Sequence, residues 1–419
     1  MRVLLSSILY PTSGINIRCL FTIIYTDLKG KTRLIRGTGL GKLARDCDLA
    51  RLLAMQLDEL DYVLPHERIA QRPLERRDAS RLLALDRTSG SYQDRLFSEL
   101  PQLLSGNELI VLNNAKVIPA RLFGHRIGVH SQPASRATKK EHLTGAVEVF
   151  LTQHLEPGVW NALVRPGRKM KTGERIRFGQ GELQAEIIGR GELGLRTLRF
   201  ESGDTRKISE HIEQLGHVPL PPYIDREDEA ADRERYQTVF ARNPGAIAAP
   251  TAGLHFTPEI LAAIRQRGAE ICELTLNVGL GTFQPIHSDT LEGHHMHAES
   301  YEISEETVAR VTAARAAGRP ILAVGTTVVR ALEDAAMKAA ESGSQALLYP
   351  GKAEAEIFIV PGFRFKVVSA LLTNFHLPRS TLLALVCAFA GCQHVLAAYK
   401  HGVDAGYRFY SYGDCMLIR

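Results

Sequence analysis

Three histidines and a carboxylate lie within the six residues HHMHAE at 294–299. Histidine titrates near neutral pH and also binds metals, so the cluster could hold a metal ion, exchange protons, or form an inert polar loop. A helical zinc site commonly places its histidines four residues apart, whereas His294 and His297 are three apart and are followed by Glu299. This spacing favours metal-free acid–base or ligand-binding chemistry over the two alternatives.

A glycine turn leads from an apolar segment into a helical one in ILAVGTTVVRALE, residues 321–333. Backbone N–H groups at such a helix start, together with the positive end of the helix dipole, suit a carboxylate or a phosphate at Thr326 and Thr327. Arg330 lies one turn further along and could add a bidentate contact to the same anion. A capped turn with a solvated arginine is the alternative interpretation.

The most apolar long segment is preceded by an unusual number of polar groups in TNFHLPRSTLLALVCAFAG, residues 373–391. The pattern predicts a strand end, a turn at Pro378 and a buried helix. A plain helix cap needs one hydroxyl, so the additional polar groups favour contact with a ligand. The candidates here are Asn374, Phe375, His376, Ser380 and Thr381.

PTAGLHFTPE, residues 250–259, predicts the start of another helix, with Thr257 as its N-cap and Pro258 at its first position. His255 stands between a leucine and a phenylalanine just before that start. A histidine in such surroundings is more often a hydrogen-bonded core residue than a catalytic one, and both interpretations remain open.

Two further segments combine turns with groups that could contact a ligand. NVGLGTFQPI, residues 277–286, ends a strand with glycines that would let a ligand approach the backbone, although an ordinary tight turn would look the same. YRFYSYGDCMLI, residues 407–418, alternates aromatic and polar residues and predicts a strand. Tyr410 on that strand could stack on a base, and Asp414 follows a glycine.

These candidate groups need a scaffold, and the hydrophobic pattern predicts one of mixed type. Buried strand patterns at RLLALDR and NELIVLNN, and alternating helical and strand patterns in the second half, indicate an α/β layer. Short alternating segments broken by Gly and Pro indicate a small β-barrel. We therefore predict an α/β fold in which a large layered domain (55–121 and 206–419) carries an inserted barrel (122–205). Residues 1–54 form an atypical extension, either disordered or produced by a misassigned start.

Composition excludes several classes of protein. The six cysteines form no C-x-x-C pair, which argues against a cysteine zinc site and a disulfide framework, and favours a cytoplasmic protein. The apolar run at 381–392 is shorter than the roughly 20 residues that span a bilayer, so we expect no membrane association. The net charge of +5 divides into +6 for residues 1–54 and −1 for the remainder, so only local clustering could favour a polyanionic partner.

Ten segments stand out along residues 55–419: DASRLLALDR, NNAKVIPARLFG, HVPLPPYI, RYQTVFA, AAPTAGLHFT, NVGLGTFQPI, HHMHAE, AVGTTVVRALE, TNFHLPRSTLLALVCAFAG and YSYGD. They occur in the order found in the S-adenosylmethionine:tRNA ribosyltransferase-isomerases of queuosine biosynthesis, and over these residues the sequence resembles that family.

The resemblance implies an enzyme that uses S-adenosylmethionine as a ribosyl donor. The acceptor would be the aminomethyl group of 7-aminomethyl-7-deazaguanine at the wobble position of a tRNA. Adenine and methionine would leave, and the ribosyl unit would rearrange to give epoxyqueuosine. S-adenosylmethionine would then be a consumed co-substrate, and the resemblance implies no metal and no other cofactor. We expect a monomer.

This reaction needs a base next to the sulfonium and a proton donor for the leaving purine. The acid–base candidates, with carboxylates that could orient them, are His255, His294, His297, His376, Glu299 and Asp414. Arg330 with the threonine turn would suit the methionine carboxylate, and Tyr410 or Phe375 could stack on adenine. The complete set of candidate S-adenosylmethionine contacts is Thr251, Gly281, Thr282, Thr326, Thr327, Arg330, Asn374, Phe375, Ser380, Thr381 and Tyr410.

A tRNA must also be held, and RPGRKMKTGERIR at 165–177 concentrates six cations against one anion, Glu174, on an expected barrel hairpin. This clustering suits phosphate contacts, with a solvated hairpin as the alternative. The cations are Arg165, Arg168, Lys169, Lys171, Arg175 and Arg177. Two rival functions remain at this point: a metal-dependent hydrolase centred on HHMHAE, and a non-catalytic RNA-binding module.

Overall fold

The structure is a computed structural model that describes residues 57–127, 143–204, 206–279 and 298–419, together with three strands near the N-terminus. Those strands, β1 (Val3–Ile8), β2 (Leu20–Thr26) and β3 (Thr32–Thr38), pair antiparallel in the order β1-β2-β3. The interpretation of residues 1–54 as an extension that is disordered or misassigned stays a prediction.

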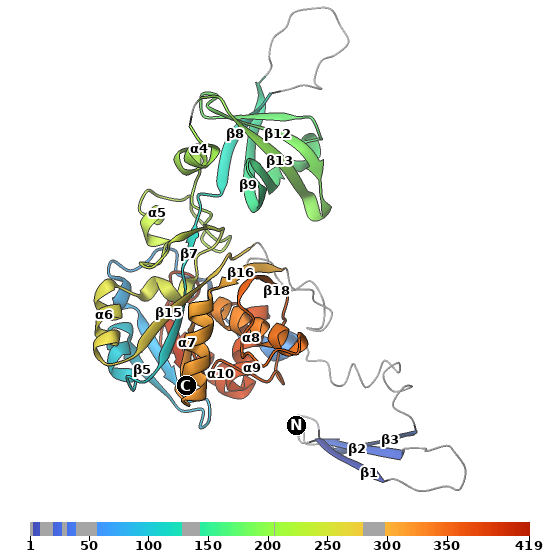
Figure 1. Cartoon of the computed structure of the whole chain (residues 1–419), viewed down its shortest axis with the longest axis vertical. Coiled ribbons are helices and arrows are strands. Elements are labelled where there is room, and N and C mark those ends of the chain that lie inside the picture. The colour runs from blue at the N-terminus through green and yellow to red at the C-terminus, as the bar shows by residue number, and fades with distance from the viewer. Residues whose placement is uncertain are drawn as a thin grey trace, which may run out of the picture. The chain divides into compact units, whose positions relative to one another are not determined.

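A nine-stranded mixed sheet forms the centre of the larger part of the chain, in the order β18-β16-β15-β6-β17-β19-β20-β4-β5 (Figure 1). Its strands are β4 (Arg81–Leu85), β5 (Tyr92–Leu96), β6 (Leu109–Asn113), β15 (Glu270–Leu276), β16 (Glu299–Ile303), β17 (Ile321–Val324), β18 (Gly351–Ala355), β19 (Ala370–Asn374) and β20 (Cys415–Ile418).

The central strands β15, β6, β17 and β19 run parallel, so their carboxyl ends meet at one edge of the sheet. β20 runs antiparallel to β19 and begins opposite Asn374, which brings the residues that precede Cys415 to the same edge. The continuous apolar runs LIVL, ILAV and CMLI are buried throughout, as expected for strands covered on both faces. The outermost strand β5 is exposed along its whole length and carries polar residues that protect the edge.

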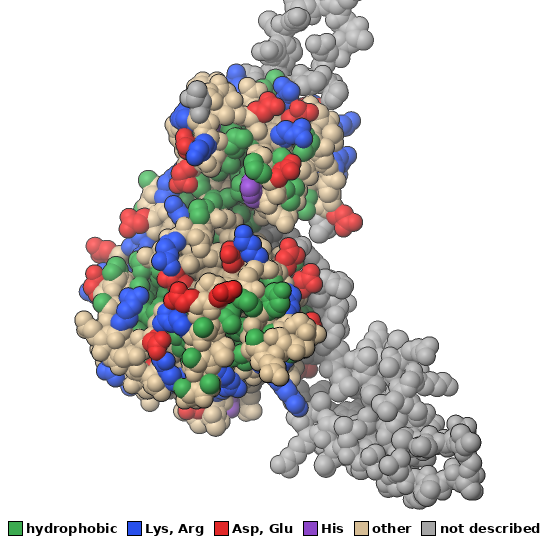
Figure 2. All heavy atoms as spheres, viewed as in Figure 1, with side chains coloured by type: hydrophobic (Ala, Val, Ile, Leu, Met, Phe, Trp, Pro, Cys, Tyr) green, Lys and Arg blue, Asp and Glu red, His purple; other side chains and the backbone are tan. Residues whose placement is uncertain are grey.

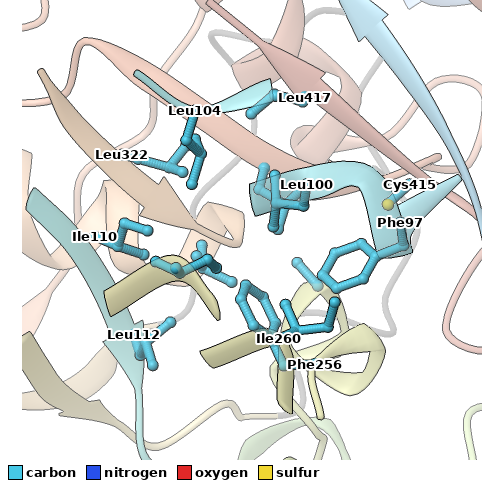
Figure 3. Close-up of a cluster of buried hydrophobic side chains, with 14 of the residues drawn as sticks. Phe97, Leu100, Leu104, Ile110, Leu112, Phe256, Ile260, Leu322, Cys415 and Leu417 are labelled. Carbon is cyan, nitrogen blue, oxygen red and sulfur yellow. The ribbon is translucent and has the colours of Figure 1, made fainter. Parts of the chain in front are cut away.

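Helices pack on this sheet, and several begin where the sequence predicts. They are α3 (Leu100–Leu103), α6 (Pro258–Gln266), α7 (Glu305–Ala316), α8 (Thr326–Glu341), α9 (Thr381–Ala390) and α10 (Cys392–Asp404). The Thr257, Ser304 and Ser380 side chains cap α6, α7 and α9. One buried cluster joins sheet and helices, with Ile110 and Leu322 of the sheet near Ile260 of α6 (Figure 3).

A second unit of structure is a closed six-stranded barrel in the order β10-β13-β12-β11-β8-β9. Its strands are β8 (Arg121–Ile127), β9 (Leu143–Glu156), β10 (Val159–Arg165), β11 (Arg175–Phe178), β12 (Leu183–Arg190) and β13 (Leu195–Ser202) (Figure 1). Alternate residues such as Leu183, Ala185 and Ile187 fill its interior. The predicted α/β fold with an inserted barrel is confirmed, while the domain limits at 122 and 205 stay a prediction.

The chain between barrel and sheet forms smaller elements. They are α4 (Ile208–Leu215), α5 (Asp232–Arg235), and the parallel pair of β7 (Ala115–Val117) and β14 (Asn243–Ala246). Residues that follow β14 continue into the 3₁₀ helix η7 (Thr251–His255). β14 and η7 thus lead the chain back to the main sheet just before α6.

Two predictions about local structure are wrong. Of residues 407–418 only Cys415–Ile418 is a strand, while Phe409 makes an isolated bridge to Ile69 and a turn follows it. Tyr410 has a left-handed backbone conformation (φ 70°), which breaks the extended pattern. The basic segment 165–177 is no hairpin, because it connects β10 to β11 and these strands are not neighbours in the barrel.

Charged side chains of both signs share the surface, and the most apolar helix is largely buried. Lys, Arg, Asp and Glu side chains are interspersed over the described surface that Figure 2 presents. Within the described residues no single helix is long and apolar enough to cross a membrane. Helices α9 and α10 pass such a test only as a pair, and they bend by 116° at Gly391. Most of α9 is buried, as predicted for this segment.

Candidate active site

A cavity of about 250 Å³ lies at the edge of the sheet where the parallel strands end. Val278 after β15, Gly325 after β17 and Asn374 at the end of β19 all line it. Ligands of α/β sheets commonly bind at this edge, because the chain leaves each strand there and opens into turns. Two tyrosines from the region between barrel and sheet, Tyr223 and Tyr236, complete the lining.

The cavity brings together most of the predicted ligand-binding residues that the structure describes. They come from four segments that are distant in sequence: η7, the turn before α8, the turn before α9, and the turn before β20. The predicted residues that line the cavity are Thr251, Thr326, Thr327, Asn374, Phe375, His376, Ser380, Thr381 and Tyr410.

Two residues that line the cavity have strained backbones. Arg379 (φ 56°) and Tyr410 (φ 70°) are the non-glycine residues with a left-handed conformation in the described part of the chain. Hydrogen bonds hold both, since the Arg379 N–H donates to the carbonyl oxygen of Leu60 and the Tyr410 N–H to that of Phe375. Such strain persists where surrounding contacts enforce it, and it concentrates at functional sites.

Tyr410 and Tyr223 form an aromatic wall, with ring centroids 4.6 Å apart. The Tyr223 hydroxyl lies 2.7 Å from Ser411 Oγ, which fixes the orientation of that ring. Phe375 is fully buried and packs against Tyr399 and other aromatic rings. Both rings belong to residues that line the cavity, and Tyr410 keeps a small exposed fraction of 5%, whereas Phe375 has none.

Two helices begin at the cavity. Ser380 caps α9, because its Oγ accepts a hydrogen bond from the Leu383 N–H. Helix α8 instead begins after Gly325 (φ 92°), an N-cap residue that has no side chain to cap it. The Thr327 Oγ1 atom is buried at this start and has no hydrogen-bond partner within the described ranges. The uncapped N–H groups and the helix dipole make this position suitable for an anionic group.

Two buried histidines lie in or behind the cavity, and both are neutral at neutral pH. His376 lines the cavity, with Nε2 2.7 Å from Thr373 Oγ1, and burial lowers its pKa to about 3. His255 does not line the cavity, and its two ring nitrogens contact Ser80 and Asn374. Burial, and then the positive charges of nearby arginines, lower the pKa of His255 to about 3.

Three of the predicted charged residues lie away from the cavity. Arg330 and Glu299 are buried and form an ion pair with each other, and Arg330 also donates to the Ala355 carbonyl oxygen. Glu299 accepts from the N–H of Gly279, next to the cavity residue Val278. The Asp414 carboxylate accepts from the backbone N–H groups of Arg81 and Arg408, and burial raises its pKa. In the structure these groups therefore hold the surrounding turns and strands.

A family model described as queuosine biosynthesis protein matches residues 57–418. A relative from Solibacter usitatus is 53% identical, over 87% of this chain and all of the relative. The chain belongs to this family. The relative from Solibacter usitatus and one from Moorella thermoacetica, 47% identical over the same shares, are both named S-adenosylmethionine:tRNA ribosyltransferase-isomerase.

A solved structure also resembles this queuosine biosynthesis family member. It is a crystal structure of S-adenosylmethionine tRNA ribosyltransferase from Thermotoga maritima, 37% identical, covering 86% of this chain and all of the other, with a TM-score of 0.46. The family model over residues 57–418 and the relative that is 53% identical confirm, at the level of the family, the resemblance found from ten sequence segments.

Part of the predicted site lies outside the described residues of this family member. His294, His297, Gly281 and Thr282 belong to the segment 280–297, and their proposed roles stay predictions. Across the described ranges, no group of three or more His, Cys, Asp and Glu side chains is placed to hold a metal ion.

Several lining residues were not predicted from the sequence. Three of them are each adjacent to a predicted residue: Thr373, Arg379 and Ser411. The sequence analysis therefore found the segments that line the cavity, but not every lining residue within them. Tyr223 and Tyr236 come from the family segments HVPLPPYI and RYQTVFA, whose residue types carried no chemical signal by themselves. Their position beside Tyr410 and Ser411 depends on tertiary folding.

Proposed function

We propose that this chain is an S-adenosylmethionine-dependent tRNA ribosyltransferase-isomerase. It transfers and isomerises the ribosyl moiety of S-adenosylmethionine onto 7-aminomethyl-7-deazaguanine at the tRNA wobble position, and releases adenine and methionine. The observation that carries the proposal is the composition of the cavity, which joins an uncapped helix start to an aromatic wall. Relatives 45–53% identical that bear this enzyme's name support it.

The two ends of S-adenosylmethionine match the two ends of this cavity chemically. The methionine carboxylate fits the start of α8, where backbone N–H groups and the Thr327 hydroxyl can donate to it. The adenine ring fits against Tyr410. The carboxylate role that the sequence suggested for Arg330 passes to the helix start, because the guanidinium of Arg330 is already paired with Glu299.

Proton transfer must begin next to the sulfonium, which acidifies the adjacent ribose C–H bonds. His376 is an acid–base candidate that lines the cavity, and its imidazole is neutral across the neutral pH range. A pKa of about 3 makes it a weak base, so we assign it an orienting hydrogen bond to the substrate. The stronger base is then sought in HHMHAE, at His294 or His297, with proton donation to the leaving purine from the same segment.

We propose the basic segment 165–177 of the barrel as the tRNA contact. Arg165, Arg168, Lys169, Lys171 and Arg175 are exposed there, and Arg177 is half-buried. The anion in this segment, Glu174, is buried and paired with Arg126, so it does not offset the exposed cations. This gives the barrel a local positive cluster that suits phosphate groups, although the net charge outside residues 1–54 is close to zero.

Reversal of charge tests the proposed contact. A variant with Arg168→Glu and Lys169→Glu should bind tRNA more weakly, and log K against log salt should become shallower by about 0.7–0.9 for each lost phosphate contact. Reversal at Arg265 and Arg267, on and just after α6, provides a control of equal charge change. Equal salt slopes for the wild type and the barrel variant would reject the contact.

The proposed activity itself is tested with the purified protein, S-adenosylmethionine and a tRNA that carries 7-aminomethyl-7-deazaguanine in its anticodon. The expected products are free adenine, methionine and an epoxyqueuosine nucleoside in the digested tRNA. Appearance of S-adenosylhomocysteine with a methylated nucleoside would instead identify a methyltransferase. A cytoplasmic location and a monomeric state belong to the same proposal.

A further inference from the structure

The side-chain amide of Asn374 is bonded on one side only. Its Nδ2 atom lies 3.2 Å from His255 Nε2, 3.1 Å from the Tyr410 carbonyl oxygen and 3.4 Å from that of Asp414. Its Oδ1 atom is buried without a partner in the described part of the chain. Because three acceptors surround the nitrogen, a turned amide would place oxygen against oxygen, so the orientation of the group is determined.

The partners of His255 determine which of its ring nitrogens carries the proton. Ser80 Oγ donates to the Arg77 carbonyl oxygen, so it accepts from His255 Nδ1, 2.9 Å away. Nε2 is then the unprotonated nitrogen, and it accepts from the amide of Asn374. The hydrogen bonds from Ser80 through His255 to Asn374 therefore agree in donor and acceptor at every step, and they hold the Asn374 nitrogen against His255 and the Tyr410 carbonyl oxygen.

A second strand-end asparagine shows what the fold does when an amide is purely structural. Asn113 ends β6, next to β17 in the sheet, and is equally buried. Its Nδ2 donates to the Leu276 carbonyl oxygen, and its Oδ1 accepts from the N–H groups of Ala115 and Leu276. Asn374 differs in that it lines the cavity and its buried Oδ1 accepts no hydrogen bond from the described residues.

We propose that Asn374 Oδ1 accepts a hydrogen bond from the adenosyl group of the substrate, and that Ser80 and His255 are positioning residues that keep this oxygen directed into the cavity. The proposal rests on the function proposed above and adds a specificity contact to it. The donor is an N–H or O–H group, supplied either by the 6-amino group of adenine or by a ribose hydroxyl. Because the Asn374 nitrogen is already used, the contact reads a donor only.

The test compares dissociation constants for four probes: adenosine, purine riboside, which lacks the 6-amino group, 2′-deoxyadenosine and 3′-deoxyadenosine. The wild type should bind adenosine roughly three- to tenfold more tightly than the analogue that lacks the contacted donor, as expected for one neutral hydrogen bond. Asn374→Leu should reduce that ratio to about one. The probe whose ratio collapses identifies the donor as the amino group or as one of the two hydroxyls.

The positioning role predicts that substitutions at Ser80 and His255 have a partial effect on the same ratio. Ser80→Ala and His255→Leu free the amide to turn, so each should lower the same ratio. His255→Leu combined with Asn374→Leu should lower it no further than Asn374→Leu alone, because the histidine acts through the asparagine. A structural defect would instead weaken all four probes equally. Ser80→Ala is the smallest change, and it decides the matter if a leucine variant does not fold.

Two control variants remove buried polar groups away from the cavity. Thr238→Val and Asn113→Leu should leave the probe ratios of the wild type unchanged, whatever they do to the melting temperature. If the wild type binds neither S-adenosylmethionine nor adenosine, the proposed function fails. If it binds them and all ratios are the same in the wild type and in Asn374→Leu, this inference fails while the proposed function stands.

Discussion

A matched pair of threonines offers a sharp test of the cavity. Thr327 and Thr238 each have a buried hydroxyl oxygen without a partner among the described residues, but Thr327 lines the cavity and Thr238 does not. Valine has nearly the same shape as threonine and lacks the hydroxyl. Replacement of either residue by valine therefore isolates what that one oxygen contributes.

The expected magnitudes follow from the cost of a buried polar group without a partner, about 1–3 kcal/mol. Thr238→Val removes this cost in the free protein and should raise the free energy of unfolding by about 1 kcal/mol, with no effect on ligand affinity. Thr327→Val should be similarly tolerated by the free protein. If the hydroxyl donates to the methionine carboxylate, however, the variant should bind S-adenosylmethionine less tightly by about 1–2 kcal/mol, roughly five- to thirtyfold.

Titration calorimetry with S-adenosylmethionine and urea unfolding on the three proteins would measure both quantities. Methionine as a competing ligand adds a second check, since it carries the carboxylate but no adenosine. Its affinity should fall by the same factor in Thr327→Val. Equal S-adenosylmethionine affinities for Thr327→Val and Thr238→Val would refute the assignment of this helix start as the carboxylate site.

Three further predictions concern pH, charge and strain. The pKa of about 3 for His255 and His376 lies below the unfolded value near 6.5, so between these pH values the unfolded chain binds protons that the folded chain does not. The free energy of unfolding should therefore fall with decreasing pH by up to about 1.4 kcal/mol per pH unit for each histidine. Urea unfolding at pH 7 and pH 5 should give a smaller difference in this free energy for His376→Gln than for the wild type. Glu299→Leu should lower the free energy of unfolding by about 3–5 kcal/mol, because it leaves the buried Arg330 without its carboxylate. Adding Arg330→Met to this variant should restore much of the lost stability in thermal melts, and a double variant that is no more stable than Glu299→Leu would contradict the pairing. Tyr410→Gly and Tyr410→Ala both remove the ring, but only glycine also relieves the left-handed strain, so the glycine variant should melt at a temperature no lower than the alanine variant. Both variants should bind S-adenosylmethionine equally weakly, and wild-type affinity in either would exclude stacking on Tyr410.

Hydrophobic pattern and caps predicted much of the scaffold. The runs LIVL and ILAV are long enough and apolar enough to specify buried strands, and Thr257 and Ser380 have side chains that satisfy helix N–H groups locally. These signals act over a few residues, so they are visible in the sequence. The turn at Tyr410 is not visible there, because its left-handed backbone is held by Asn374 at the end of β19 and by Phe375 just after it.

The candidate site was predictable to the extent that its segments carry polar groups beside strand ends. Thr326, Asn374 and Ser380 meet in the cavity because parallel strands put their carboxyl ends at one edge. Contacts between side chains that are far apart in the sequence could not be predicted from it. Nothing in ILAVGTTVVRALE indicates that Arg330 is neutralised by Glu299, or that His255 contacts Asn374 from behind the cavity.

The most direct test of the central claim uses S-adenosylmethionine labelled in its ribose ring and tRNA that carries 7-aminomethyl-7-deazaguanine. The account predicts that the label enters the tRNA while adenine and methionine appear in equal amounts, one of each per labelled tRNA. Label that stays in S-adenosylhomocysteine, or adenine released without labelled tRNA, would contradict it.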